Sequence, residues 1–220
     1  MVLVFDLDDT LYEEMSYVRS GFKAVAAYGE REFGLNASHS FDWMICRVKI
    51  HGRGRVFDDW LSRNQAFTKK RLYECLRVYR HHIPNISLSS SVTQLLDELN
   101  LAVPLYLVTD GHKVVQQKKI QALRLEKFFK RIFITHRFGL KHSKPSIHCF
   151  DIIRKAEGVP WRHIVYVGDN PAKDFVNLNV AGARTVRVRT GAYAHVVATP
   201  AYDGRLTIDT LEDLTTALAY

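Results

Sequence analysis

The second half of the chain alternates between short apolar runs and segments with the periodicity of a helix. From residue 104, LYLVTD is followed by HKVVQQKKIQAL, RIFIT by a helical segment at about 146–157, and HIVYVGD by PAKDFVNLNVAG. Short apolar runs of this kind form strands that are buried on both faces. Their alternation with helices predicts a parallel sheet with helices on both faces and right-handed crossovers.

The run VLVF at residues 2–5 predicts a first strand of the same sheet, although about a hundred residues separate it from the next one. The segments 13–33 and 66–82 between them have helical spacing, and FDDWLS at 57–62 indicates a shorter helix. We therefore expect a Rossmann-like α/β core formed by residues 1–13 and 89–220. A small all-helical domain at 14–88 interrupts it.

Composition excludes several classes of protein. Of the 220 residues 47% are hydrophobic and 25% charged, which is typical of a globular protein. No apolar stretch is long enough to cross a bilayer, so we expect a cytoplasmic protein without membrane contact. The three cysteines, Cys46, Cys75 and Cys149, are far apart and form no CxxC pair. A disulfide framework or a zinc cluster is therefore not supported.

The formal net charge of +8 raises the question of a nucleic-acid partner. Lysines and arginines are spread over the chain, however, and no motif for nucleic-acid binding accompanies them. We expect no nucleic acid. An anionic small substrate explains the excess, as does a solvated basic surface. The protein is expected to be a monomer or a homodimer.

Polar residues follow three of the expected strands. Asp6 and Asp8 come after the first, Thr109 and Asp110 after the second, and Asp169 after the strand HIVYVG. In an open parallel sheet the active site lies outside the carboxyl ends of the strands, so these groups should converge. Residues two apart at a strand end point to the same side, which predicts that Asp6 and Asp8 face one cavity while Asp9 points elsewhere.

Together with Asp174, up to four carboxylates would then surround one point. Such a group is tolerable only with a cation, and a hard, oxygen-preferring ion such as Mg²⁺ fits best where phosphate is the other partner. Lys144 in SKPS supplies a second, fixed positive charge. The combination suits a phosphoryl group held between metal and ammonium.

In these residues the chain resembles the haloacid dehalogenase superfamily, in its phosphatase branch. The four signature motifs appear in order as DLDDT, VTDG, the lysine of SKPS, and VGDNPAKD. The resemblance implies that Asp6 is the nucleophile that forms an aspartyl-phosphate. It implies that Asp8 protonates the leaving oxygen and then activates water.

The same resemblance implies the other roles at the site. Thr109 and the backbone N–H of Asp110 would hold phosphoryl oxygens, and Lys144 would neutralise charge on the nucleophile and the transferred group. The metal would be bound by the carboxylates of Asp6 and Asp169 and by the backbone carbonyl of Asp8. Asp174 would bind it through water or orient the other ligands.

One position departs from the family pattern. Where the family often has Ser/Thr-Asn-Gly, this chain has Thr109-Asp110-Gly111. A carboxylate that faced the phosphate would repel it. We therefore expect the Asp110 side chain to point away and to cap the helix that begins near His112, a position where aspartate is favoured.

The insert at 14–88 follows the first motif directly, where this family places a mobile helical cap. Within CRVKIHGRGRVFDDW, Arg53 and Arg55 form a basic turn with two glycines. This turn either recognises a second anionic group of the substrate or is a solvated loop. His112, beside the second motif, is a further candidate for substrate contact.

Three aromatic residues of the insert, Trp43, Phe57 and Trp60, allow two interpretations. They could stack on a base or a sugar, or pack in the core of the helical domain. The expected function is a Mg²⁺-dependent phosphatase for a small phosphorylated metabolite, either a nucleoside monophosphate or a sugar phosphate. The alternatives are a phosphotransferase or phosphomutase of the same family, and a non-enzymatic anion-binding module.

Overall fold

The computed structural model describes residues 1–218 as two compact units. The core unit consists of residues 1–14 and of the chain from residue 87 onward, and the helical unit consists of residues 15–86. Each unit has its own hydrophobic core. In the described part of the chain, no helix is long and apolar enough to pass through a membrane.

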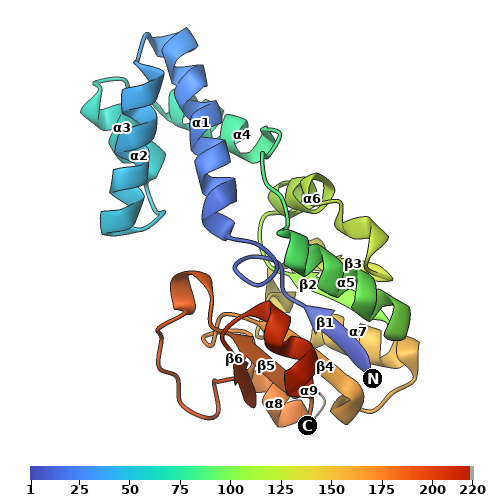
Figure 1. The fold of residues 1–220 in the computed structure, drawn as a ribbon. Helices are drawn as coiled ribbons and strands as arrows, with labels where there is room; N and C mark the ends of the chain where they lie inside the picture. Colours follow the sequence, from blue (N-terminus) through green and yellow to red (C-terminus); the bar gives the residue numbers. More distant parts are fainter. Residues whose placement is uncertain (219–220) are drawn as a thin grey trace. The chain divides into compact units, whose positions relative to one another are not determined.

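A six-stranded sheet forms the centre of the core unit (Figure 1). Every neighbouring pair of strands is parallel, and the spatial order is β3-β2-β1-β4-β5-β6. The predicted parallel α/β sheet is therefore confirmed. The strands are β1 (Val2–Phe5), β2 (Leu105–Thr109), β3 (Arg131–Ile134), β4 (Ile164–Gly168), β5 (Arg184–Val188) and β6 (Leu206–Ile208).

Helices cover both faces of this sheet, because alternate side chains of its apolar strands point to opposite sides. Val2 and Val4 face the cluster that contains Phe150 of α7 (His148–Glu157) and Leu178 of α8 (Val176–Ala181). Figure 1 shows α5 (Ser90–Ala102) and α9 (Leu214–Leu218) on the opposite side of the sheet. The unit also contains α6 (Lys113–Ala122).

The register of the sheet brings three strand ends together. Phe5 of β1 pairs with Leu107 of β2 and with Val167 of β4, so the central strand ends level with both neighbours. The ladder continues for one more bond, from the Asp6 N–H to the Val167 carbonyl oxygen at 2.9 Å. The polar residues that follow these strands consequently share one edge of the sheet.

One helix begins later than expected. The segment PAKDFVNLNVAG was expected to be helical from its start, but α8 begins only at Val176. Residues 170–174 form a turn, in which the Asp174 N–H donates to the Asn170 carbonyl oxygen at 3.0 Å. Asp174 therefore belongs to the turn after β4 and not to a helix.

The helical unit contains four helices around an apolar core, in which Trp60 is 1% exposed. Phe57 is also buried there, and Trp43 packs against the same cluster. Of the two interpretations of these aromatics, packing in the domain core is confirmed. The helices are α1 (Glu14–Phe33), α2 (Ala37–His51), α3 (Val56–Arg63) and α4 (Lys69–His81).

The basic segment of this unit is more helical than the sequence suggested. Helix α2 was not expected. It begins at Ala37 because Asn36 caps its start by accepting from the His39 N–H at 2.9 Å, and it runs to His51. Arg47 lies in this helix and pairs with Asp59 at 2.6 Å. Only residues 52–55 form the turn between α2 and α3.

The contact between Gly29 and Trp60 gives a test of packing in the helical unit. Replacing a glycine inside a helix by alanine ordinarily stabilises it by about 0.5–1 kcal/mol. A Cβ atom at Gly29, however, would lie 2.5 Å from the Trp60 ring. We predict that Gly29→Ala lowers the free energy of unfolding by about 1–3 kcal/mol in urea denaturation. In a Trp60→Leu background the same change should cost less, and an equal cost in both backgrounds would contradict the contact.

Candidate active site

Three buried carboxylates meet at the carboxyl edge of the sheet. Asp6 follows β1, Asp169 follows β4, and Asp174 lies in the turn beyond it. One oxygen of each lies within 4.8 Å of the others, and all three side chains are buried. The predicted convergence of the first and fourth motifs is observed for these three residues.

Lys144 lies against two of these acids. Its Nζ atom is 2.8 Å from the Asp6 carboxylate and 2.8 Å from the Asp174 carboxylate, and it also donates to the Tyr166 hydroxyl at 2.8 Å. Burial alone lowers the pKa of Lys144, but the two carboxylates raise it well above its usual value. The residue is therefore a fixed ammonium inside the site.

Asp169 has no such partner: within residues 1–218 no lysine, arginine or histidine forms an ion pair with it. Burial, with the charges of Asp6 and Asp174, raises the pKa of Asp169 to about 9. Burial likewise raises the pKa of Asp6 to about 6. With all three carboxylates ionised, the group would carry more negative charge than one lysine offsets, and its oxygen donors suit a hard divalent cation such as Mg²⁺.

Asp8 does not join this group, which corrects the expectation that four carboxylates crowd around one point. Strand β1 ends at Phe5, and the chain then turns, with the Leu11 N–H donating to the Leu7 carbonyl oxygen at 3.0 Å. The alternation of a strand no longer applies beyond that point. The Asp8 carboxylate turns instead toward α6, where the Lys119 ammonium lies 2.7 Å away.

Two further donors reach the same carboxylate. The Tyr12 hydroxyl lies 2.7 Å from one Asp8 oxygen, and the Gln116 amide nitrogen lies 2.9 Å from the other. Although burial raises the pKa of Asp8, Lys119 and these hydrogen bonds lower it below its usual value. Asp8 is therefore held as a carboxylate by a cation of its own.

The second motif contributes Thr109 and Asp110 at the end of β2. Thr109 is buried, and its hydroxyl oxygen lies 2.6 Å from the Gln116 amide nitrogen. Asp110 does not cap the following helix, which corrects that expectation: α6 begins after His112 without a side-chain cap. The Asp110 carboxylate accepts instead from the Lys144 backbone N–H at 3.1 Å and from the Thr135 hydroxyl.

A family model described as haloacid dehalogenase-like hydrolase matches residues 1–182. The chain belongs to this family. Two similar proteins are the glyceraldehyde 3-phosphate phosphatase of Methanopyrus kandleri, 30% identical over 87% of this chain and 84% of its own length, and the N-acylneuraminate-9-phosphatase of Rattus norvegicus, 27% identical over 89% and 85%.

Solved structures agree with this assignment of the fold. The putative HAD-hydrolase YfnB from Bacillus subtilis aligns with a TM-score of 0.71 and 19% identity, covering 100% of this chain and 98% of its own. Because similar curated proteins are phosphatases, this haloacid dehalogenase-like hydrolase is a phosphatase of the family.

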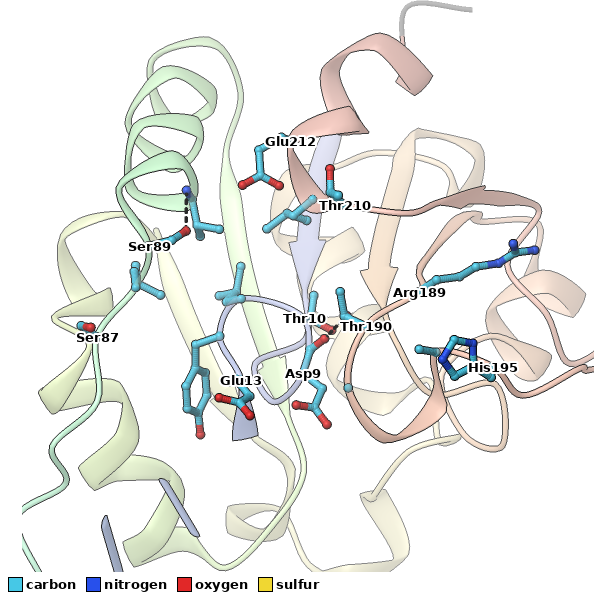
Figure 2. Close-up of a pocket in the computed structure, with 17 residues that line it drawn as sticks. Asp9, Thr10, Glu13, Ser87, Ser89, Arg189, Thr190, His195, Thr210 and Glu212 are labelled. Carbon is cyan, nitrogen blue, oxygen red and sulfur yellow. Dashed lines mark hydrogen bonds between the residues drawn. The ribbon is translucent and has the colours of Figure 1, made fainter. Parts of the chain in front are cut away.

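Asp9 lies outside the carboxylate group, and its hydrogen bonds stabilise the turn that follows Asp8. Its carboxylate accepts from the Glu14 N–H at 2.8 Å and from the Ala192 N–H at 3.3 Å, and its carbonyl oxygen accepts from the Thr190 hydroxyl. Figure 2 shows Thr190 beside Asp9 at a pocket of about 840 Å³. Asp6, Lys144 and Asp169 do not line this pocket, so it is distinct from the carboxylate site.

The three candidate specificity residues are all exposed. Arg53 and Arg55 lie in the turn between α2 and α3 of the helical unit, where Arg55 has a left-handed backbone with φ of 60°. His112 precedes α6 in the core unit. Their part in substrate recognition stays a prediction.

Sequence reasoning missed three polar residues that contact the site. Tyr166 lies inside β4, where it resembles any other buried aromatic residue. Gln116 and Lys119 have a detectable signal, because they occupy buried positions three apart on α6, where a helix ordinarily places apolar residues.

The contacts of Asp110 generate a prediction about the Lys144 loop. Asp110→Ala removes the acceptor of a buried N–H, so we expect it to lower the free energy of unfolding by about 1–3 kcal/mol in urea denaturation. Asp110→Asn keeps one oxygen there and should cost less than about 1 kcal/mol. Exposed Asp97 of α5 provides the control, since Asp97→Ala should have little effect. An equal loss in the alanine and asparagine variants would contradict the interpretation.

Proposed function

We propose that the protein is a Mg²⁺-dependent phosphomonoesterase that hydrolyses a small phosphorylated metabolite through an aspartyl-phosphate on Asp6. The observation that carries this proposal is the charge arrangement around Asp6. A buried lysine lies 2.8 Å from Asp6, and two further buried carboxylates lie beside it. This arrangement supports a nucleophilic carboxylate with cations at hand for a transferred phosphoryl group.

The proposed roles divide the reaction into two steps. Asp6 attacks phosphorus, and the bond to the ester oxygen breaks while that oxygen takes a proton from Asp8. Asp8 must bind this proton before the step, because Lys119 favours its carboxylate form. Water then attacks the phosphoryl group on Asp6, and Asp8 accepts the proton that water loses. Each step is easier than direct hydrolysis of an unreactive ester.

The remaining residues would hold the phosphoryl group and its charge. The Thr109 hydroxyl and the Asp110 backbone N–H would bind phosphoryl oxygens, and Lys144 would neutralise the group as it passes to Asp6. Mg²⁺, bound by Asp6, Asp169 and the Asp8 carbonyl with Asp174 in direct or water-mediated contact, would supply further positive charge to those oxygens.

Among small metabolites, a sugar phosphate is favoured over a nucleoside monophosphate. The similar phosphatases are named for glyceraldehyde 3-phosphate and for N-acylneuraminate 9-phosphate. In addition, Trp43, Phe57 and Trp60 pack in the core of the helical unit, so they do not support a platform for stacking a base. The basic composition is compatible with either anionic substrate.

The helical unit would act as the family's cap, with Arg53 and Arg55 as residues that select the substrate together with His112. A cap of this kind excludes water from the reacting centre and tightens electrostatic interactions there. We also propose that the protein acts in the cytoplasm as a monomer or homodimer, with neither nucleic acid nor membrane as a partner.

The first prediction from this proposal concerns turnover. With Mg²⁺, the protein should release inorganic phosphate from sugar phosphates, nucleoside monophosphates and p-nitrophenyl phosphate, with the highest kcat/KM on a sugar phosphate. Asp6→Asn removes the nucleophile and should lower kcat at least about 10³-fold, whereas Asp97→Asn, at an exposed position of α5, should not. An isomerised ester in place of free phosphate would indicate a phosphomutase. No product from any ester would favour an anion-binding module.

A second prediction concerns metal binding and pH. The usual pKa of an aspartate is 3.8, and burial raises that of Asp169 to about 9. In metal-free protein the contribution of Asp169 to stability is therefore present in acid and is lost as the pH rises between these values. Mg²⁺ binds the ionised form of Asp169 and therefore competes with protons for it. This competition weakens as the pH rises.

We therefore expect Mg²⁺ to raise the unfolding temperature more at about pH 8.5 than at about pH 6.5. Asp169→Asn should remove most of this rise at both pH values, since the amide carries no titrating proton and no charge. Differential scanning fluorimetry measures both effects. A rise that is equal at the two pH values, or larger in the more acidic buffer, would contradict the prediction.

A further inference from the structure

Two buried polar side chains of α6 end at Asp8. Gln116 is 1% exposed and Lys119 is 2% exposed, and they lie three positions apart on one face of the helix. The Lys119 ammonium is 2.7 Å from one Asp8 oxygen, and the Gln116 amide nitrogen is 2.9 Å from the other. Burying an ammonium or an amide is costly without a partner. Asp8 is a partner of both groups, and Glu14 lies 3.6 Å from the Lys119 ammonium.

Gln116 also connects Asp8 to the second motif. The same amide nitrogen lies 2.6 Å from the Thr109 hydroxyl oxygen and 2.9 Å from the Asp110 carbonyl oxygen. Gly111 leaves room for this side chain: its φ is 135°, and a Cβ atom there would lie 3.2 Å from Gln116. The turn after β1 and the end of β2 are thus joined through one side chain of α6.

Three side chains donate to the Asp8 carboxylate. Besides Gln116 and Lys119, the Tyr12 hydroxyl lies 2.7 Å from the Asp8 oxygen that Lys119 contacts. A carboxylate with donors on both oxygens is fixed in orientation and remains an acceptor. This is the form that the second step of the proposed reaction needs.

In that second step, the water oxygen forms a bond to phosphorus while the bond from phosphorus to the Asp6 oxygen breaks. The electron pair of the broken bond stays on Asp6, and the water proton passes to Asp8. Positioning of the acceptor matters here because a misplaced general base loses much of its effect.

We propose that Gln116 and Lys119 are positioning residues that orient Asp8 to accept the proton of the attacking water, so that their loss slows hydrolysis of the phosphoryl-enzyme more than its formation. This inference rests on the proposed function. It assigns to α6 a part in the second step of the reaction.

Pre-steady-state kinetics with p-nitrophenyl phosphate and Mg²⁺ test the inference, because p-nitrophenolate leaves without a proton and the first step then needs no acid. We expect Gln116→Met and Lys119→Met to release a burst of p-nitrophenolate stoichiometric with enzyme, followed by turnover about tenfold slower than that of the wild type. Intact mass spectrometry after a quench should show a phosphoryl adduct, which Asp6→Asn should lack. Lys119→Arg should restore part of the turnover.

Neighbouring residues of the same types provide matched controls. Gln117 accepts from exposed Arg137 at 2.7 Å, so Gln117→Met should show neither a burst nor slower turnover. Lys118→Met removes an adjacent positive charge from the same helix and should also show neither a burst nor slower turnover. If Lys119→Met does not fold, as judged by its urea unfolding curve, Gln116→Met and Tyr12→Phe still carry the test.

Two outcomes would overturn the inference while leaving the proposed function intact. One is wild-type turnover in both methionine variants. The other is a loss of burst and steady-state rate in equal proportion with no adduct, as a general loosening of the fold would give. Absence of turnover in the wild type on every ester would instead remove the proposed function and this inference with it.

Discussion

The ion pairs of Lys144 are the interactions on which the rest of the site depends. Three carboxylates at the end of a buried sheet repel one another strongly, since water is excluded and screening is weak. The Lys144 ammonium lies 2.8 Å from Asp6 and from Asp174, and its backbone N–H is held by Asp110. The second motif therefore fixes the lysine that makes the first and fourth motifs compatible with folding.

The acidic residues of the site pair with two different cations. Lys144 forms ion pairs with Asp6 and Asp174, whereas Lys119 on α6 forms an ion pair with Asp8. This separation allows the pKa values of neighbouring carboxyl groups to shift in opposite directions. Burial raises the pKa of Asp6, while Lys119 lowers that of Asp8 despite its burial.

The sequence was sufficient to predict the sheet and the meeting of Asp6 and Asp169, because both arise from local regularities, whereas Lys144 was assigned to the site from the order of the family's motifs. Apolar runs of strand length identify β1 and β4, and parallel pairing then places the residues after these strands at one edge. The direction of the Asp8 side chain was predicted wrongly because the alternation of side chains ends with the strand at Phe5. Beyond that residue, the direction of a side chain depends on the partner that tertiary packing provides.

The contacts of the Asp110 side chain are also decided by partners that are distant in the chain. A carboxylate just before a helix is favourable as a cap, yet here it accepts from Thr135 and the Lys144 backbone, 25 and 34 residues away in the chain. Helix α2 was missed for a local reason: its start depends on the cap at Asn36, and the helices expected for the insert left residues 34–56 unassigned. Long-range partners and weak local signals thus explain the errors separately.

Support for the first motif also comes from a part of the chain beyond the family match, which ends at residue 182. Arg187 on β5 is buried, and its guanidinium donates to the carbonyl oxygens of Tyr193 at 2.7 Å and Val196 at 2.8 Å. The loop fixed in this way contains Thr190, which donates to the Asp9 carbonyl oxygen. A buried arginine that donates to two loop carbonyls and also pairs with Asp203 at 3.1 Å limits the conformations that the loop can adopt. Because Asp9 directly follows Asp8, the loop after β5 holds the backbone beside the proposed proton acceptor, while two side chains of α6 contact its carboxylate.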